Sequence, residues 1–122
     1  MRFLLPWQRV RVSGQSMTPT LLDGNLVLVR HQARVRPGQV VLARFRSRED
    51  LAVIKRVERA AGGGWLLASD NPRAGTDSRQ HGVADVLAVA VWMWPTGPVQ
   101  PHPGVLRRLV GRRLPPAPPD GL

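Results

Sequence analysis

Apolar and polar residues alternate with a period of two over most of the chain before Pro95, which is typical of strands rather than helices. The alternation is clearest at residues 8–13, and the other apolar runs are short and rich in valine and leucine. The pattern predicts strands at residues 8–13, 26–29, 40–45, 51–59, 65–68 and 86–94. No sustained helical period is found before residue 103.

Turn-forming residues separate these predicted strands. Asp23-Gly24 and residues 36–39 mark turns, and the polar residues 46–50 form a hairpin loop. Three glycines at 62–64 join their flanking strands in a second hairpin. Residues 70–82 are interpreted as an ordered loop. Short strands at this spacing favour a mostly β fold, either a small, partly closed β-barrel or a coiled antiparallel sheet.

The composition changes after Pro95. Prolines recur at positions 95, 98, 101 and 103, which indicates an extended linker, and four arginines follow before residue 114. We therefore expect a domain at residues 1–95 and a Pro-rich basic tail at 96–122, with a possible short helix at 104–114. The tail either contacts an acidic surface or anionic lipid, or has no role beyond solvation.

The amino-acid composition limits the kinds of site that the chain can contain. The chain of 122 residues has no cysteine, which leaves no disulfide or thiolate metal site. His31, His81 and His102 form no metal-binding or triad spacing, so we expect neither metal nor cofactor. No apolar run reaches the roughly 18 residues of a membrane-spanning helix. The sequence is therefore interpreted as a cytoplasmic protein, at most peripheral at a membrane.

The formal net charge of +10 comes from seventeen arginines and a single lysine, Lys55. Strand alternation places Lys55 on one face with Val53 and Val57, while Arg56 is expected to point outward. Burial disfavours the ammonium form and lowers the pKa of a lysine, whereas an arginine keeps its proton near neutral pH. Lys55 is therefore a candidate general base, although a lysine at a strand edge can also reach solvent.

A candidate nucleophile precedes it. Residues 13–20 read Ser-Gly-Gln-Ser-Met-Thr-Pro-Thr and join the first two predicted strands. Gly14 allows a substrate backbone to approach, and the backbone N–H of Ser16 or a neighbour can face a developing oxyanion. These residue types are also common in turns, so the segment alone is weak support for catalysis. With Lys55 it forms a possible Ser–Lys pair, a known variant of nucleophile activation.

Three ordered segments resemble the type I signal peptidase family. They are the nucleophile segment 13–20, the base segment 54–57, and the segment 70–82, which reads Asp-Asn-Pro-Arg-Ala-Gly-Thr-Asp-Ser-Arg-Gln-His-Gly. The resemblance spans about residues 12 to 91 and implies the family's β-rich catalytic core. It also implies a groove beside the nucleophile in which the substrate adds as a β-strand.

The resemblance implies roles for individual residues. Ser16 would attack the scissile carbonyl, and Lys55 would accept its proton; Gly14, Gln15 and Met17 would shape the nucleophile turn. The supporting loop would comprise Ser69, Asp70, Asn71, Asp77, Ser78 and Arg79, with Asp77 and Arg79 forming an ion pair. Ser69 replaces the family's usual glycine, and Gly75 stands where many relatives carry the serine that orients the lysine. The orienting hydroxyl could therefore be that of Ser69, Thr76 or Ser78.

The resemblance also suggests substrates. A short chain without an N-terminal anchor resembles the proteases that mature nickel-type superoxide dismutase, so the expected partner is a precursor protein with an N-terminal propeptide. The alternative within the family is a peripheral signal peptidase acting on exported preproteins, with residues 92–94 at the bilayer interface.

Two alternatives come from other classes. SOS-repressor proteases share the Ser–Lys chemistry and a β-rich fold but cut themselves, and a chain of this length leaves no room for their DNA-binding domain. A basic nucleic-acid-binding β-barrel without catalysis would fit the charge. It is disfavoured because the chain has two phenylalanines and no tyrosine for stacking on bases.

Overall fold

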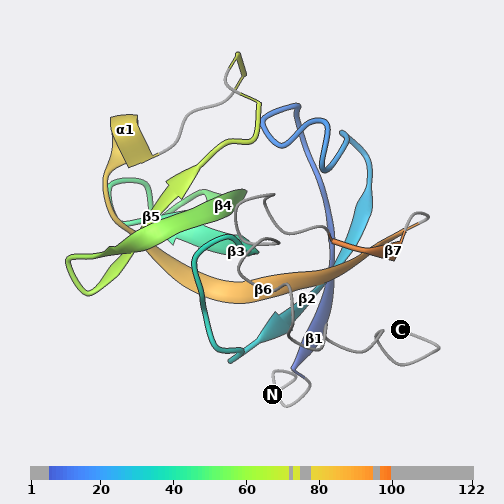
Figure 1. Ribbon diagram of the computed structural model, residues 1–122, viewed down its shortest axis with the longest axis horizontal. Helices are drawn as coiled ribbons and strands as arrows, with labels where there is room; N and C mark the ends of the chain where they lie inside the picture. The colour runs from blue at the N-terminus through green and yellow to red at the C-terminus, as the bar shows by residue number, and fades with distance from the viewer. Residues whose placement is uncertain (1–5, 72, 75–77, 95–96, 100–122) are drawn as a thin grey trace, which may run out of the picture.

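The computed structural model describes residues 6–71, 73–74, 78–94 and 97–99, which form a curled antiparallel sheet with one short helix (Figure 1). The strands are β1 (Trp7–Arg11), β2 (Leu26–His31), β3 (Val40–Phe45), β4 (Ala52–Ala61), β5 (Gly64–Ala68), β6 (Ala84–Trp94) and β7 (Gly97–Pro98). The helix α1 (Ser78–His81) is a single turn. The mostly β prediction is therefore confirmed.

The seven strands form one antiparallel sheet in the order β1-β2-β6-β3-β4-β5, with β7 paired to β6. The long strand β6 bends at two register shifts, one opposite β2 and one opposite β3. Its start meets β5 through the pairing of Trp65 with Ala84. The prediction of a single antiparallel sheet is confirmed, and the sheet is not a closed barrel.

Most of the strands were predicted from local patterns. Their segments either alternate apolar and polar residues or are rich in β-branched residues, and glycine-containing turns separate several of them. The hairpin over residues 62–64 is confirmed, with Gly62 and Gly63 at φ angles of 57° and 78°, in the left-handed region that glycine favours. Two short elements were not predicted. The helix α1 lies in the expected loop, and β7 lies in the expected linker, where Pro98 can occupy a strand because it pairs at the end of β6. The possible helix at 104–114 lies outside the described residues.

Each face of the sheet has its own hydrophobic cluster. One contains Val27, Val29, Val40 and Leu42 together with residues of the β1–β2 connection. The other contains Val41, Ala43, Phe45, Val57 and Leu67, with Val53 packed against it. Strand β4 therefore contributes alternate residues to two buried faces, which sets the environment of the charged residues at its centre.

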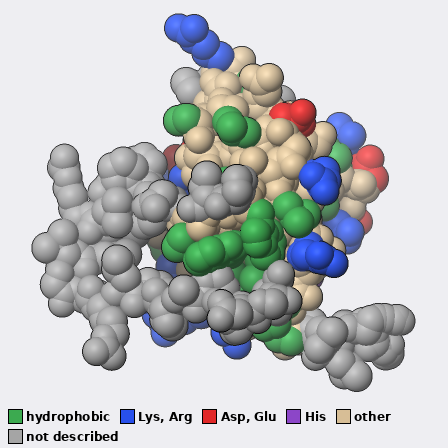
Figure 2. All heavy atoms as spheres, turned by 90° about the vertical axis from the view of Figure 1, so that its right-hand side faces the viewer, with side chains coloured by type: hydrophobic (Ala, Val, Ile, Leu, Met, Phe, Trp, Pro, Cys, Tyr) green, Lys and Arg blue, Asp and Glu red, His purple; other side chains and the backbone are tan. Residues whose placement is uncertain are grey.

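No helix within the described ranges is long and apolar enough to cross a membrane. Figure 2 shows apolar side chains gathered on the side of the molecule where β7 lies, with basic side chains at the margin. Residues 92–94, at the end of β6, are half-buried, and two of them pair with β7. The bilayer contact suggested for these residues stays a prediction.

Candidate active site

The connection between β1 and β2 carries Ser16 on a well-anchored turn. Val12, Met17 and Leu21 are buried in the first cluster, so the turn is fixed to the sheet on either side of the serine. Gly14 has a φ of 89°, which favours glycine, and its N–H donates a hydrogen bond to the Asp23 carboxylate at 2.8 Å. Ser16 itself is half-buried, so its hydroxyl sits on a rigid support with access to solvent.

Asn71 fastens the same turn from the other side. Its side-chain amide donates to the carbonyl of Gln15 at 3.1 Å and to the hydroxyl of Thr18 at 3.0 Å. Its backbone N–H donates to the carbonyl of Ser16 at 2.8 Å. These bonds join segments 53 to 56 positions apart in sequence. The third sequence segment therefore holds the turn that presents Ser16.

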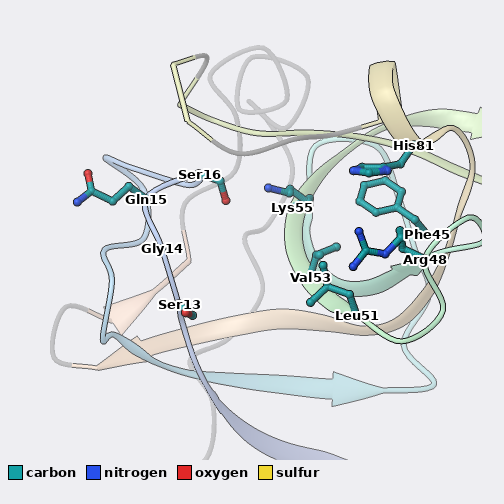
Figure 3. A pocket seen from close by; sticks show the side chains of 10 residues that line it. All are labelled: Ser13, Gly14, Gln15, Ser16, Phe45, Arg48, Leu51, Val53, Lys55 and His81. Carbon is teal, nitrogen blue, oxygen red and sulfur yellow. The ribbon is translucent and has the colours of Figure 1, made fainter.

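Lys55 lies at the centre of β4 and is buried, with 5% of its surface exposed. It shares a face with Val53 and Val57, as the alternation predicted. In Figure 3 its amine and the hydroxyl of Ser16 point toward one another. Both line a cavity of about 280 Å³, with Ser13, Gly14, Gln15, Phe45, Arg48, Leu51, Val53 and His81. The structure thus brings the candidate nucleophile and the candidate base to one cavity.

The hydroxyl beside the amine is that of Ser69. Lys55 Nζ donates to Ser69 Oγ at 3.0 Å, across the β4–β5 hairpin. Ser78 is engaged elsewhere, because its Oγ accepts a hydrogen bond from the N–H of Leu67 at 2.7 Å. Thr76 lies outside the described residues. Of the three candidates for orienting Lys55, Ser69 has the observed contact.

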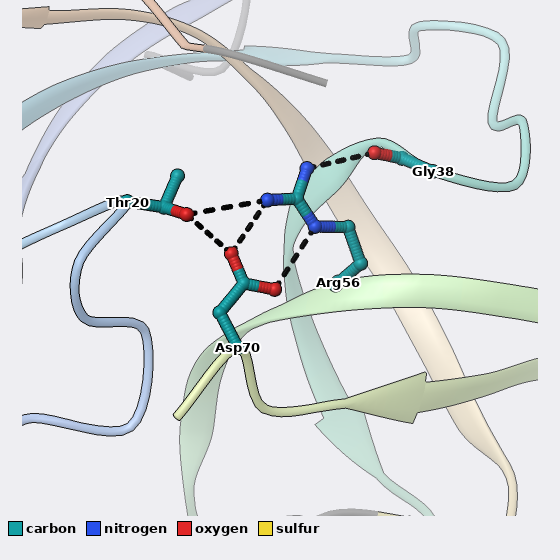
Figure 4. Close-up of polar contacts among 4 residues, drawn as sticks. All are labelled: Thr20, Gly38, Arg56 and Asp70. Carbon is teal, nitrogen blue, oxygen red and sulfur yellow. Dashed lines mark hydrogen bonds and ion pairs between the residues drawn. The ribbon is translucent and has the colours of Figure 1, made fainter. Parts of the chain in front are cut away.

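The expectation that Arg56 points outward is wrong. Arg56 is buried, with 6% of its surface exposed. Its Nε donates to Asp70 at 3.1 Å and one terminal amino group contacts the second Asp70 oxygen, while the other donates to the carbonyl of Gly38 at 2.9 Å (Figure 4). The hydroxyl of Thr20 contacts both Arg56 and Asp70. The second face of β4 is therefore covered, by the β1–β2 connection and the turn before β3.

The Arg56–Asp70 pair ties together the three segments that build the site. Arg56 lies next to Lys55, Asp70 lies between Ser69 and Asn71, and Thr20 belongs to the Ser16 connection. A buried guanidinium stays charged, so breaking this pair would remove the carboxylate that it contacts through two of its nitrogens. The expected Asp77–Arg79 pair cannot be placed, because Asp77 lies outside the described residues; Arg79 is exposed in α1.

Other predicted site residues take supporting positions. Gln15 is exposed, and Figure 3 shows its side chain directed away from Lys55. Met17 is 1% exposed in the core next to Ser16.

Four residues that line the cavity were not predicted from the sequence: Phe45, Arg48, Leu51 and His81. Alternation within the predicted strand 51–59 could have pointed to Leu51 and Val53, which share a face with Lys55. Phe45, Arg48 and His81 come from other segments, which only the fold brings to the cavity.

Metal binding has no candidate site in the part of the chain that the structure describes. No group of three or more histidine, cysteine, aspartate or glutamate residues there could hold an ion. His81 instead packs its ring against Phe45, with centroids 4.9 Å apart. The polar side-chain groups at the cavity include the hydroxyls of Ser13 and Ser16, the amine of Lys55, the guanidinium of Arg48 and the ring of His81.

A comparison with protein-family models gives a match. A model of the Peptidase S24-like family matches residues 8–91, which is more than half of the chain and includes Ser16, Lys55, Ser69 and the supporting loop. No curated protein matches the chain. The match supports the prediction of a serine peptidase, although in a family other than the type I signal peptidases that the three segments resemble. The signal peptidase alternative is accordingly not favoured.

Proposed function

The chain belongs to the Peptidase S24-like family, and from this premise we propose that it is a serine endopeptidase whose nucleophile is Ser16 and whose general base is Lys55. The observation that carries the proposal is the geometry in Figure 3, where the serine hydroxyl and the buried amine point toward each other across one cavity. Ser–Lys pairs are an established alternative to Ser–His–Asp triads.

The proposed reaction has two stages. Neutral Lys55 accepts the proton of the Ser16 hydroxyl as Oγ attacks the peptide carbonyl, and the ammonium then returns a proton to the leaving amine. The resulting acyl-enzyme is hydrolysed by a water that Lys55 deprotonates in turn. The backbone N–H of Ser16 is the proposed oxyanion donor. The N–H of Gly14 is excluded from that role, because it is bound to Asp23.

Ser69 is the proposed positioning residue for the base. Its hydroxyl accepts from Lys55 Nζ at 3.0 Å and keeps the amine on the side of the strand that faces the cavity. Ser69 would thus orient the lysine, a role that a serine at the position of Gly75 has in many signal peptidases. Arg56 and Asp70 would act one step further away, by holding β4, the supporting loop and the Ser16 connection in register.

For the substrate, we propose the N-terminal propeptide of a precursor protein, with nickel-type superoxide dismutase as the first candidate. This choice is supported only by the resemblance of the sequence segments to such maturation proteases. The geometry supports a more general statement: the cavity beside Ser16 is open to a peptide side chain.

The test is a cleavage assay on a nickel superoxide dismutase precursor and, in parallel, on a proteome-derived peptide library. Wild type is compared with Ser16→Ala and Lys55→Ala, and the folding of each variant is checked by urea unfolding. The proposal predicts cleavage by wild type alone. Cleavage of library peptides but not of the precursor would reject the substrate and keep the mechanism, whereas activity in folded Ser16→Ala would reject the mechanism. A sample without substrate reveals any self-cleavage.

The pH profile tests the base independently. Only the neutral amine accepts a proton, so the rate should rise with pH between about 5 and 9 as Lys55 loses its proton. A flat profile over this interval would contradict lysine as the base.

A further inference from the structure

The cavity extends from the reacting groups to a wall that the proposed mechanism does not use. This wall consists of Phe45, Leu51, Val53 and His81, with Arg48 on the side of the cavity away from Ser16 (Figure 3). Because Ser16 and Lys55 line the same cavity, a substrate side chain that enters it must belong to a residue close to the cleaved bond. The chemistry of the wall should therefore select the substrate.

The lining combines an apolar surface with positive charge. Phe45 is 1% exposed and packs with Val53 in the second cluster, which provides a fixed apolar surface. Arg48 supplies a cationic group on the side away from Ser16, and none of the ten described lining residues is acidic. Such a cavity favours a side chain with an apolar stem and a carboxylate at its end, since guanidinium–carboxylate bonds are charge-assisted.

We propose that this cavity binds an acidic side chain, glutamate or aspartate, of a substrate residue next to the cleaved bond, with Arg48 holding its carboxylate. The proposal rests on the peptidase function proposed above and names the class of substrate. The methylene groups of the bound side chain would contact Phe45 and Val53. Recognition of the carboxylate on the side away from Ser16 keeps the added negative charge apart from the reacting groups.

Arg48 is well placed for this role because its loop is anchored before any substrate arrives. At the start of the loop, Arg46 binds the Asp85 carboxylate at 2.8 Å and the carbonyl of Gly62 at 2.8 Å. The hydroxyl of Ser47 donates to the carbonyl of His81 at 3.0 Å, which links the loop to α1. The N–H of Leu51 closes the turn on the carbonyl of Arg48 at 3.1 Å. A preformed loop lowers the entropy cost of binding.

The present partner of Arg48 leaves room for a substrate. Its Nε donates to Asp50 at 3.3 Å, and the two side chains are 51% and 74% exposed. Exposed pairs of this kind contribute little, so a substrate carboxylate can compete. Within the described residues the two terminal amino groups of Arg48 make no hydrogen bond, and they are the donors that a bidentate carboxylate contact uses.

The experiment begins with cleavage of a proteome-derived peptide library by wild type, with Ser16→Ala as the blank, to find the position with the strongest side-chain preference. Matched synthetic peptides with glutamate or glutamine at that position are then compared by kcat/KM. The variants are Arg48→Ala and Arg48→Glu. The control is Arg44→Ala, which removes the same charge from an exposed position of β3 that does not line the cavity.

Wild type and Arg44→Ala should prefer the glutamate peptide by about five- to tenfold, the range expected for a partly exposed charge-assisted contact. Arg48→Ala should lose the preference, and Arg48→Glu should favour a lysine peptide instead. Equal cleavage of the two peptides by wild type, or equal effects of Arg44→Ala and Arg48→Ala, would overturn this inference alone. Absence of any Ser16-dependent cleavage would overturn the proposed function, and this inference with it.

Discussion

Lys55 and Arg56 are neighbours on β4 and are similarly buried, at 5% and 6% exposure, yet their side chains lie on opposite faces of the strand. Lys55 faces a cavity, and its amine donates to the neutral hydroxyl of Ser69. Arg56, on the opposite face, is held by the carboxylate of Asp70 and the carbonyl of Gly38. The carboxylate of Asp70 favours the charged form of the Arg56 guanidinium, whereas the amine of Lys55 lines the cavity that also contains Ser16. Two buried basic residues on one strand can therefore have different roles: Lys55 is the proposed catalytic base, and Arg56 holds the segments of the site together.

The comparison also explains the choice of residue at each position. An arginine in place of Lys55 could not act as a base, because a guanidinium keeps its proton near neutral pH. A lysine in place of Arg56 could not reach Asp70, Gly38 and Thr20 together, because it lacks the planar set of donors that Arg56 uses.

The largest effect on stability is expected when the ion pair between Arg56 and Asp70 is broken. Asp70→Ala would leave the Arg56 guanidinium buried without its carboxylate, which costs about 3–5 kcal/mol in comparable buried pairs. The free energy of unfolding, measured in urea, should fall by that amount. The double variant Arg56→Met/Asp70→Leu is the control, and it should lose less than Asp70→Ala alone. A loss below about 1 kcal/mol for Asp70→Ala, as for exposed pairs, would contradict the role assigned to the pair.

A smaller effect, on catalysis alone, is expected for Ser69→Ala. Removal of the hydroxyl deletes the hydrogen bond that Lys55 makes to Ser69, and kcat should fall about tenfold, as for the loss of one hydrogen bond. The pH–rate profile should shift, because the hydroxyl contacts the group that titrates. Ser69→Thr keeps the hydroxyl and should restore part of the activity. Equal kcat and pH profiles for wild type and Ser69→Ala would show that Ser69 does not position the base.

The smallest effect is expected at the exposed ion pair that anchors the Arg48 loop. The hydrogen bond from Arg46 holds the pKa of Asp85 below its usual range. The pair should therefore add stability above the unfolded-state pKa of an aspartate and lose it as the pH falls through the lower folded-state pKa. Asp85→Asn should lower the urea midpoint slightly at pH 7 and not at about pH 2. A larger loss at pH 2 than at pH 7 would have the wrong sign.

Most of the sheet could be predicted from the sequence because its signals are local. The strand β3 was predicted with its observed limits, and the hairpin of β4 and β5 follows from three consecutive glycines. The single lysine among seventeen arginines pointed to Lys55, and the alternation gave its face correctly. The strand limits, the hairpin and the face of Lys55 each depend on residues only a few positions apart, whereas the choice of Lys55 rests on the composition of the whole chain.

The burial of Arg56 could not be predicted in the same way. Alternation shows that Arg56 and Lys55 lie on opposite faces, but it does not show what covers each face. The cover comes from Thr20, Gly38 and Asp70, which lie between 14 and 36 positions away in the chain. The cavity wall was missed for the same reason, since Phe45 and His81 meet only after β3 and α1 have packed together.

The measurement that tests the central claim most directly compares Lys55→Met with Arg56→Lys, both for cleavage of library peptides and for urea unfolding. We predict that Lys55→Met stays folded but loses about 10²- to 10⁴-fold in kcat, the usual contribution of a general base. Arg56→Lys should be less stable, yet retain cleavage per folded molecule. Near-normal cleavage by folded Lys55→Met would contradict Lys55 as the base, and with it the proposed Ser–Lys mechanism.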